Sequence, residues 1–484
     1  MTFAARAPGS VAGGMSARLA RAVGPLAAVG AASAGAALAA LPARLGVAAV
    51  IGAVAAVVVV LGDGWLLLYV AAQPLQGVSL LGVQAFGFRL SHVFFLVVLF
   101  LLLWRVLVRR VLPPRVGLLD GLVVAFVGYT LLSIIWSPAP VSTSLVTGGK
   151  LAFNLVVFVG LSALVQRDPV RTLRTVAWGF GIAFVYMAGI SAYNLFQLGF
   201  RGLIASIVIE QSVSSSESVK GLNVALTTFT GWASRNIVAG WMALGVMVVW
   251  GTLCGRWRQI SLLERMAWFT AFAAAGGYII LSLSRGTWLG LVVTAPVVWW
   301  RAGHRVNGRM LAWLLAGGAA FAAAMVATGV WDVLVARVGV ASSAVDPAVS
   351  TRLETWKSVL VTFAQHPIAG VGIKGTEGLA RAQDIDAANV HNVYIQVLGE
   401  LGLIGAALFS WMVGYLLWRL WRAGDVLPAP FRGLAWGLFA ALTCYLAQSL
   451  TQAEFMDLGI WTVLGLAAGL VHLPAAPVTA RPPE

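Results

Sequence analysis

The chain has 484 residues, of which 60% are apolar or aromatic and only 10% are charged, with a mean hydropathy of +0.90 and a net charge of +15. Soluble domains carry about 25% charged residues, so this composition excludes a soluble enzyme or a fibre. The apolar runs are long and continuous, which excludes the alternating segments of a β-barrel. We therefore expect an all-α, polytopic membrane protein.

Apolar runs long enough to cross a bilayer define the expected spans. The first is 45–72, which is interrupted at Asp63 by a glycine on each side. With the eleven clear runs that follow, the prediction is about twelve transmembrane helices. The alternative is fourteen, if the Ala-rich segment 22–41 also spans and 45–72 divides in two. The eleven runs are 90–104, 117–136, 148–165, 175–199, 236–254, 266–283, 287–300, 310–330, 391–418, 433–451 and 457–472.

Basic residues collect on alternate connections between these spans. One side holds 21 of the 32 basic residues and 5 of the 17 acidic ones. Because positive charge is retained on the cytoplasmic side, this side is predicted to be the cytoplasm, and both termini lie there. The whole charge excess then has a topological origin, so we do not expect nucleic acid as a partner.

The same assignment divides the chain into three parts. Residues 1–44 form a basic, Ala-rich cytoplasmic arm, residues 45–473 a transmembrane domain, and residues 474–484 a cytoplasmic tail. The arm has some features of a signal peptide, but cleavage would leave the new N-terminus outside and break the alternation. Two outward-facing loops are long, 200–235 and 331–390. The larger one precedes the third-last helix.

Few features support an ATP-driven or proton-coupled transporter. The sequence contains no phosphate-binding glycine loop, and ionisable residues within the spans are scarce, which argues against a proton pathway. Cys254 and Cys444 lie 190 positions apart and are interpreted as small packing residues rather than metal ligands. Any chemistry is therefore expected at the outer face.

Three arginines lie at that outer interface. Arg235 begins a span, Arg285 lies in the short break between two spans, and Arg352 lies in the large loop. The guanidinium fork matches phosphate oxygens, so the three together would suit the diphosphate of a lipid carrier. The alternative is interfacial anchoring of each side chain.

His391 is the best candidate for a general base, because an ordinary histidine pKa of about 6.5 suits proton abstraction near neutral pH. A structural role at the helix start is the alternative. Tyr394 shares its helical face, whereas Glu400, nine positions on, faces the other way. Asp384 and Asp386 form an acidic pair of the type that holds Mg²⁺, but two carboxylates are only part of a site. We favour a solvated loop there and no metal.

These motifs resemble, in their order along the chain, the O-antigen ligase and polysaccharide polymerase superfamily of bacterial inner membranes. The resemblance covers about 120–465 and is strongest from 278 to 410. It rests on Leu-Ser-Arg285-Gly286, Arg352-x3-Trp356, His366-Pro367-Ile-Ala-Gly370-Val-Gly372, His391-Asn392-Val-Tyr394 and Gly399-Glu400-Leu-Gly402-Leu-Ile-Gly405.

The resemblance implies glycosyl transfer at the periplasmic face of the bacterial inner membrane, with inversion and without a metal or cofactor. The donor would be a glycan on undecaprenyl diphosphate. Arg285, Arg352 and Arg235 would bind the diphosphate and His391 would be the base, with Asn392, Tyr394 and Glu400 in supporting roles.

The resemblance leaves the acceptor open. A ligase would use lipid A core, a polymerase a second lipid-linked glycan, and a protein-glycosylating relative a Ser or Thr. Rivals of a different class are a transporter of lipid-linked glycans and a non-catalytic scaffold of envelope assembly.

Overall fold

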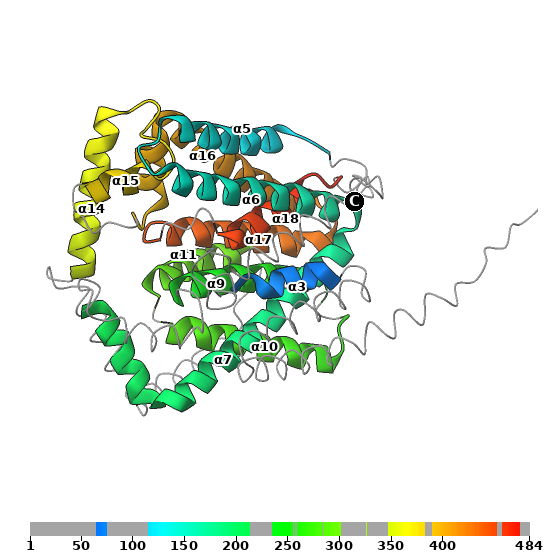
Figure 1. Cartoon of the computed structure of the whole chain (residues 1–484). Coiled ribbons are helices and arrows are strands. Elements are labelled where there is room, and N and C mark those ends of the chain that lie inside the picture. Colours follow the sequence, from blue (N-terminus) through cyan, green and yellow to red (C-terminus); the bar gives the residue numbers. More distant parts are fainter. Residues whose placement is uncertain are drawn as a thin grey trace, which may run out of the picture.

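The computed structural model describes residues 64–74, 115–212, 235–254, 256, 259–282, 284–301, 326, 347–382, 390–452 and 457–474 (Figure 1). These residues contain helices and no strand, which confirms the all-helical class. The elements are α3 (Gly64–Ala72), α5 (Leu118–Leu132), the 3₁₀ helix η4 (Ser133–Trp136), α6 (Val141–Arg167), α7 (Pro169–Ser212), α9 (Arg235–Cys254), α10 (Leu262–Leu281), α11 (Arg285–Arg301), α14 (Pro347–Gln365), α15 (Gly375–Ala382), α16 (Val393–Val426), α17 (Ala429–Gln448) and α18 (Leu458–Val471).

The described helices follow the predicted spans closely. Nine of the apolar runs coincide with a helix, from α5 to α18, and α3 forms the end of the run 45–72. Five helices are long and apolar enough to cross a membrane, and α18 is a shorter apolar helix. The chain is thus a multi-pass membrane protein by helix length and composition. The runs 22–41, 90–104 and 310–330 lie outside the described residues, apart from residue 326, so the total of twelve or fourteen stays a prediction.

Helical structure extends into both segments that were expected to be outer loops. Helix α7 continues to Ser212, past the predicted start of the loop 200–235. Residues 194–212 contain no proline, and their apolar residues recur at helical spacing, so nothing in them terminates the helix. In the larger segment, α14 and α15 occupy much of 347–382, and α14 runs across the end of the bundle helices (Figure 1).

Glycines allow α9 and α17 to approach very closely. A Cβ added at Gly251 of α9 would lie 2.7 Å from the carbonyl oxygen of Gly433, and one at Gly437 would lie 2.5 Å from that of Met247. Small residues at such a crossing let helix backbones pack in a bilayer, where apolar surface alone gives no preference for protein over lipid. Helix α17 lies at the centre of the described bundle, because α9, α11 and α16 all pack against it.

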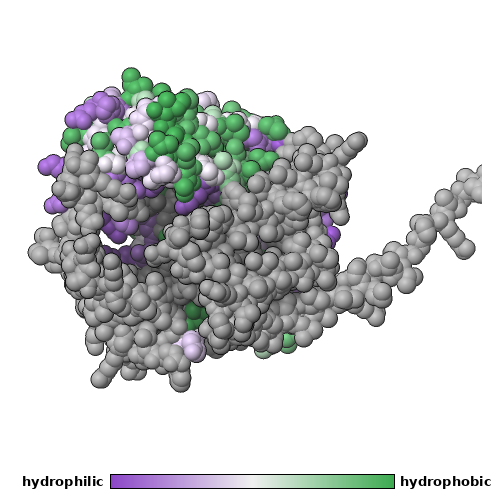
Figure 2. Space-filling view, in the orientation of Figure 1, coloured by the Kyte–Doolittle hydropathy of each residue, from purple (hydrophilic) through white to green (hydrophobic). Residues whose placement is uncertain are grey.

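Large apolar side chains also lie exposed on the outside of the bundle. Ile135 is 78% exposed, Val124 53% and Trp411 58%, and apolar residues gather on the face that α5 and α16 form (Figure 2). A soluble protein rarely exposes such a surface, whereas lipid tails solvate it. The interior is equally apolar, with Trp461 and Phe126 fully buried.

Helix α16 is broken at Gly402, whose φ of 62° is outside the helical region. The loop 366–372 occupies the break. The amides of Val371 and Gly372 bond to the last carbonyls of the first half, those of Gly399 and Glu400, at 3.1 and 2.7 Å. The first amides of the second half bond back to carbonyls of the loop. Two glycine-rich motifs, some 30 residues apart in the sequence, therefore satisfy each other's backbone groups, as a break at membrane depth requires.

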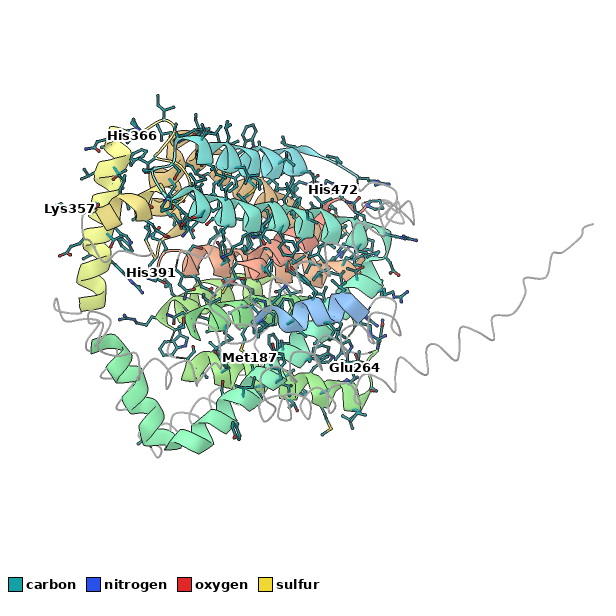
Figure 3. All side chains as sticks on the ribbon, viewed as in Figure 1. Met187, Glu264, Lys357, His366, His391 and His472 are labelled. Atoms are coloured by element: carbon teal, nitrogen blue, oxygen red, sulfur yellow. The ribbon has the colours of Figure 1, made fainter. Side chains whose placement is uncertain are left out.

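The two ends of the bundle carry different side chains. At one end, His472 Nε2 lies 2.8 Å from Asp120 Oδ2, and the Arg419 guanidinium donates to the carbonyl of Val471 at 2.5 Å. His391 lies at the opposite end (Figure 3). Residues predicted for one membrane side thus lie together. Which side each end faces stays a prediction.

Candidate functional site

His391 lies in the short connection before α16, and its backbone has a φ of 50°, in the left-handed region that non-glycine residues rarely adopt. The residues on both sides are fixed. The carbonyl of Val390 accepts a 2.8 Å bond from the indole Nε1 of Trp356, and the amide of Val393 donates a 3.0 Å bond to the carbonyl of Ser449. An uncommon backbone conformation that the surroundings hold in place is typical of functional sites.

Asn392 and Tyr394 attach the start of α16 to α17. The Asn392 side chain caps α16 by accepting from the amides of Tyr394 and Ile395 at 3.0 and 3.1 Å, and its Nδ2 donates to the carbonyl of Leu450 at 3.2 Å. The Tyr394 hydroxyl donates to the carbonyl of Leu446 at 2.7 Å. Both residues, which the sequence analysis assigned a supporting role, thus hold the start of α16, directly after His391, against the end of α17 and the turn that follows it.

Arg352 lies on α14, one turn before Trp356, and its charge acts on His391. Burial of the imidazole and the positive charge of Arg352 lower the pKa of His391 to about 4. The ordinary value of about 6.5, used in the sequence argument, therefore does not apply here. The imidazole is neutral at physiological pH, so it is able to accept a proton, although it is a weaker base than an exposed histidine.

Arg285 is the first residue of α11, and Ser284 is its N-cap. The Ser284 carbonyl accepts from the amide of Trp288 at 3.1 Å, and its hydroxyl lies 3.0 Å from that of Thr287. The predicted break between two spans is confirmed, because α10 ends at Leu281 and α11 begins at Arg285. A helix N-terminus adds its positive dipole to the arginine charge, a combination that favours anions.

Arg235 is the first residue of α9, at the same end of α9 as Gly240. Gly240 faces α17, because a Cβ added there would lie 2.7 Å from Gln448 Oε1 and 3.5 Å from Gln452 Oε1. The helices that begin with Arg235 and Arg285 therefore both pack against the last part of α17. Tyr394 bonds to the same part of α17, and Asn392 bonds to the turn that follows it.

Glu400 belongs to a different cluster. Its Oε1 accepts from Thr376 Oγ1 and from Gln396 Nε2, both at 3.1 Å, and it is 4% exposed. These contacts lie on the α15 side of α16, whereas Tyr394 bonds to α17. Lys374 and Glu377 form an ion pair close by. Glu400 and Tyr394 therefore contact different elements, and the contacts of Glu400 serve the junction of α15 with α16.

No group of three or more metal-ligating side chains occurs among the described residues. Asp384 and Asp386, the acidic pair of the sequence analysis, lie outside them.

Sequence reasoning missed the turn at residues 449–452, which contacts both the start of α16 and the start of α11. The feature that could have indicated this turn is the pair of polar amide side chains, Gln448 and Gln452, within an otherwise apolar stretch.

Comparison with known proteins agrees with the resemblance drawn from the motifs. Residues 269–410 match the protein-family model described as O-antigen ligase, and this segment contains Arg285, Arg352 and His391. No curated protein matches the chain. The match supports a membrane enzyme of the O-antigen ligase or polymerase type, which acts on lipid-linked glycans in general.

Proposed function

We propose that this protein transfers a glycan from an undecaprenyl diphosphate carrier to an acceptor hydroxyl, at the periplasmic face of a bacterial inner membrane, without a metal or cofactor. The observation that carries the proposal is the proximity of a neutral, partly buried histidine to an arginine, His391 and Arg352, on separate elements. A base for the acceptor and a cation for the leaving group are the two requirements of this reaction.

In the proposed reaction, an imidazole nitrogen of His391 accepts the proton of the acceptor hydroxyl as its oxygen attacks the anomeric carbon. The bond from that carbon to the diphosphate oxygen breaks, and the electron pair leaves with undecaprenyl diphosphate. Arg352, Arg285 and Arg235 bind the diphosphate and stabilise the developing charge. Direct displacement of this kind inverts the anomeric configuration.

Donor binding would also strengthen the base. In the free protein, the charge of Arg352 disfavours the imidazolium form of His391. A diphosphate bound to Arg352 offsets this charge, so the pKa of His391 rises toward its ordinary value. His391 thereby becomes a better base when the leaving group is in place.

We place lipid A core first among the acceptors, which would make the protein a ligase. The alternative is a polymerase that joins two lipid-linked glycans, and a Ser or Thr of a protein is a third possibility. Under this proposal the loops 200–235 and 331–390 are periplasmic, and the arm 1–44 and the tail 474–484 are cytoplasmic. A transporter of lipid-linked glycans is the rival from another class.

The test uses the purified protein in detergent with an undecaprenyl-diphosphate-linked oligosaccharide, with and without lipid A core, and in the presence of EDTA. Transfer that requires core supports a ligase, and chain extension from donor alone supports a polymerase. His391→Ala should abolish either product. Full activity in His391→Ala would refute the base, and activity lost in EDTA would refute the metal-independent mechanism. Without product in either reaction, a protein acceptor or transport becomes the better hypothesis.

A further inference from the structure

The turn at residues 449–452, which follows α17, is bonded to the start of α16. The carbonyl of Ser449 accepts from the amide of Val393 at 3.0 Å, and the carbonyl of Leu450 accepts from Asn392 Nδ2 at 3.2 Å. Ser449 is 1% exposed and Asn392 6%. Since Asn392 follows His391 directly, this turn determines the position of the proposed base.

The other side of the same turn contacts the start of α11. Gln452 Nε2 donates a 3.3 Å bond to the hydroxyl of Ser284, the N-cap residue that precedes Arg285. Gly286 packs against Thr451 so closely that an added Cβ would collide with Thr451 Oγ1. Both side chains of the hydrogen bond are buried: Ser284 is 2% exposed and Gln452 is 7% exposed.

The turn also reaches the start of α9. Gln452 Oε1 would lie 3.5 Å from a Cβ added at Gly240, which is five residues after Arg235. The Gln452 side chain thus lies between the helices that begin with Arg235 and Arg285, and its backbone belongs to the turn that holds α16. In the described part of the chain, these contacts bring the starts of α9, α11 and α16 together near the His391 end of the bundle (Figure 3).

We infer that Gln452 is a positioning residue, which fixes the N-terminus of α11 and its Arg285 relative to His391 through its hydrogen bond to Ser284. This inference rests on the proposed function, because it assigns Gln452 to the alignment of the diphosphate with the base. In this role Gln452 acts through Ser284 and not directly on the substrate.

The physical argument is one of alignment. A buried amide that loses its partner in an apolar interior is costly, so the Gln452–Ser284 bond restrains the turn and the start of α11 relative to each other. A displacement of about 1 Å between a leaving-group cation and a base costs up to about 100-fold in rate. The expected defect therefore lies in kcat, whereas the acceptor site keeps its affinity.

Gln452→Leu tests this role, and Gln448→Leu is its matched control. Gln448 is the same residue type one turn earlier, is 3% exposed and also packs against Gly240 of α9. Its Nε2, however, donates to Cys444 Sγ on its own helix at 3.1 Å, so this control tests a similar packing position without the bond to Ser284. We expect Gln452→Leu to lower kcat about 10-fold with an unchanged KM for the acceptor. Gln448→Leu should change both constants less than about 2-fold.

Ser284→Ala examines the same bond from its other partner with a smaller change, should Gln452→Leu fail to accumulate. The probe is undecaprenyl diphosphate that carries one oligosaccharide repeat. If the bond matters, the double variant Gln452→Leu/Ser284→Ala is no slower than the slower single variant. A kcat of Gln452→Leu equal to that of Gln448→Leu, or additive losses in the double variant, would overturn the positioning role alone. An inactive wild-type protein would instead overturn the proposed function, and with it this inference.

Discussion

The indole of Trp356 donates a 2.8 Å hydrogen bond to the carbonyl of Val390, which joins α14 to the residue before His391. Arg352 lies one turn before Trp356 on the same helix, so this bond fixes the arginine-bearing turn of α14 over the start of α16. The Arg352-x3-Trp356 spacing thus combines a charge with its own anchor. This hydrogen bond explains how α14, which crosses the end of the bundle, holds the charge of Arg352 near His391.

Trp356→Phe should remove this anchor and keep most of the ring. We expect glycosyl transfer to fall about 10-fold, because Arg352 loses its fixed position relative to His391, while the amount of protein in the membrane is unchanged. The measurement is product formation per inserted protein. Trp411→Phe is the control, since Trp411 on α16 is 58% exposed on the outside of the bundle. Equal activity of the two variants would contradict the anchoring role.

The pH dependence of kcat/KM should show the effect of the Arg352 charge on the pKa of His391. Burial and this charge hold the pKa of His391 near 4, so the neutral base persists down to about pH 5 in the free protein. In Arg352→Gln only burial lowers the pKa, which therefore rises toward 6.5. Because burial is the larger cause and remains in this variant, the rise is partial, and kcat/KM should begin to fall at a higher pH than in the wild type as the pH is lowered from neutral.

Lys357→Gln is the control for this measurement. Lys357 is an exposed cation on the same helix, so its removal should reduce the overall charge equally and leave the shape of the profile unchanged. A profile of Arg352→Gln that coincides with that of the wild type would show that the two side chains are not coupled.

The helices were predictable because bilayer thickness dictates the length of an apolar run. Their ends were less predictable. The predicted span 391–418 ends before Arg419, yet α16 continues to Val426, because the Arg419 guanidinium finds partners in the Tyr415 hydroxyl and the Val471 carbonyl. A charged residue therefore ended the apolar run but not the helix.

The site was predictable as a set of residue types but not as an arrangement. Arg285, Arg352 and His391 were recognisable from their motifs, whereas the effect of Arg352 on His391 depends on the contact between α14 and Val390, which no local pattern encodes. The same holds for Gln452, whose partner Ser284 is 168 residues away. The glycines at 370 and 402 were noticed, but their pairing across the α16 break required the structure.

Gly402→Ala should destabilise the protein through this break. Its φ of 62° is strained for alanine, and a Cβ would collide with the carbonyl oxygen of Ile368. We expect a loss of about 1–3 kcal/mol, visible as a lower midpoint of thermal unfolding in detergent. Gly414→Ala is a matched control on the same helix, because a Cβ there meets nothing within 4 Å. If Gly402→Ala unfolds at the temperature of Gly414→Ala, the break is not a constrained element.

The orientation in the membrane can be tested with two engineered cysteines. Lys357 and Glu264 lie at opposite ends of the molecule (Figure 3), and the charge distribution predicts that Lys357 is outside and Glu264 inside. In a background with Cys254→Ala, which removes the exposed native thiol, an impermeant maleimide should label Lys357→Cys in intact spheroplasts. Glu264→Cys should react only after lysis. The reverse pattern would invert the topology and place His391 in the cytoplasm, where the proposed periplasmic reaction is impossible. Labelling of both positions from one side would contradict the arrangement of the bundle itself.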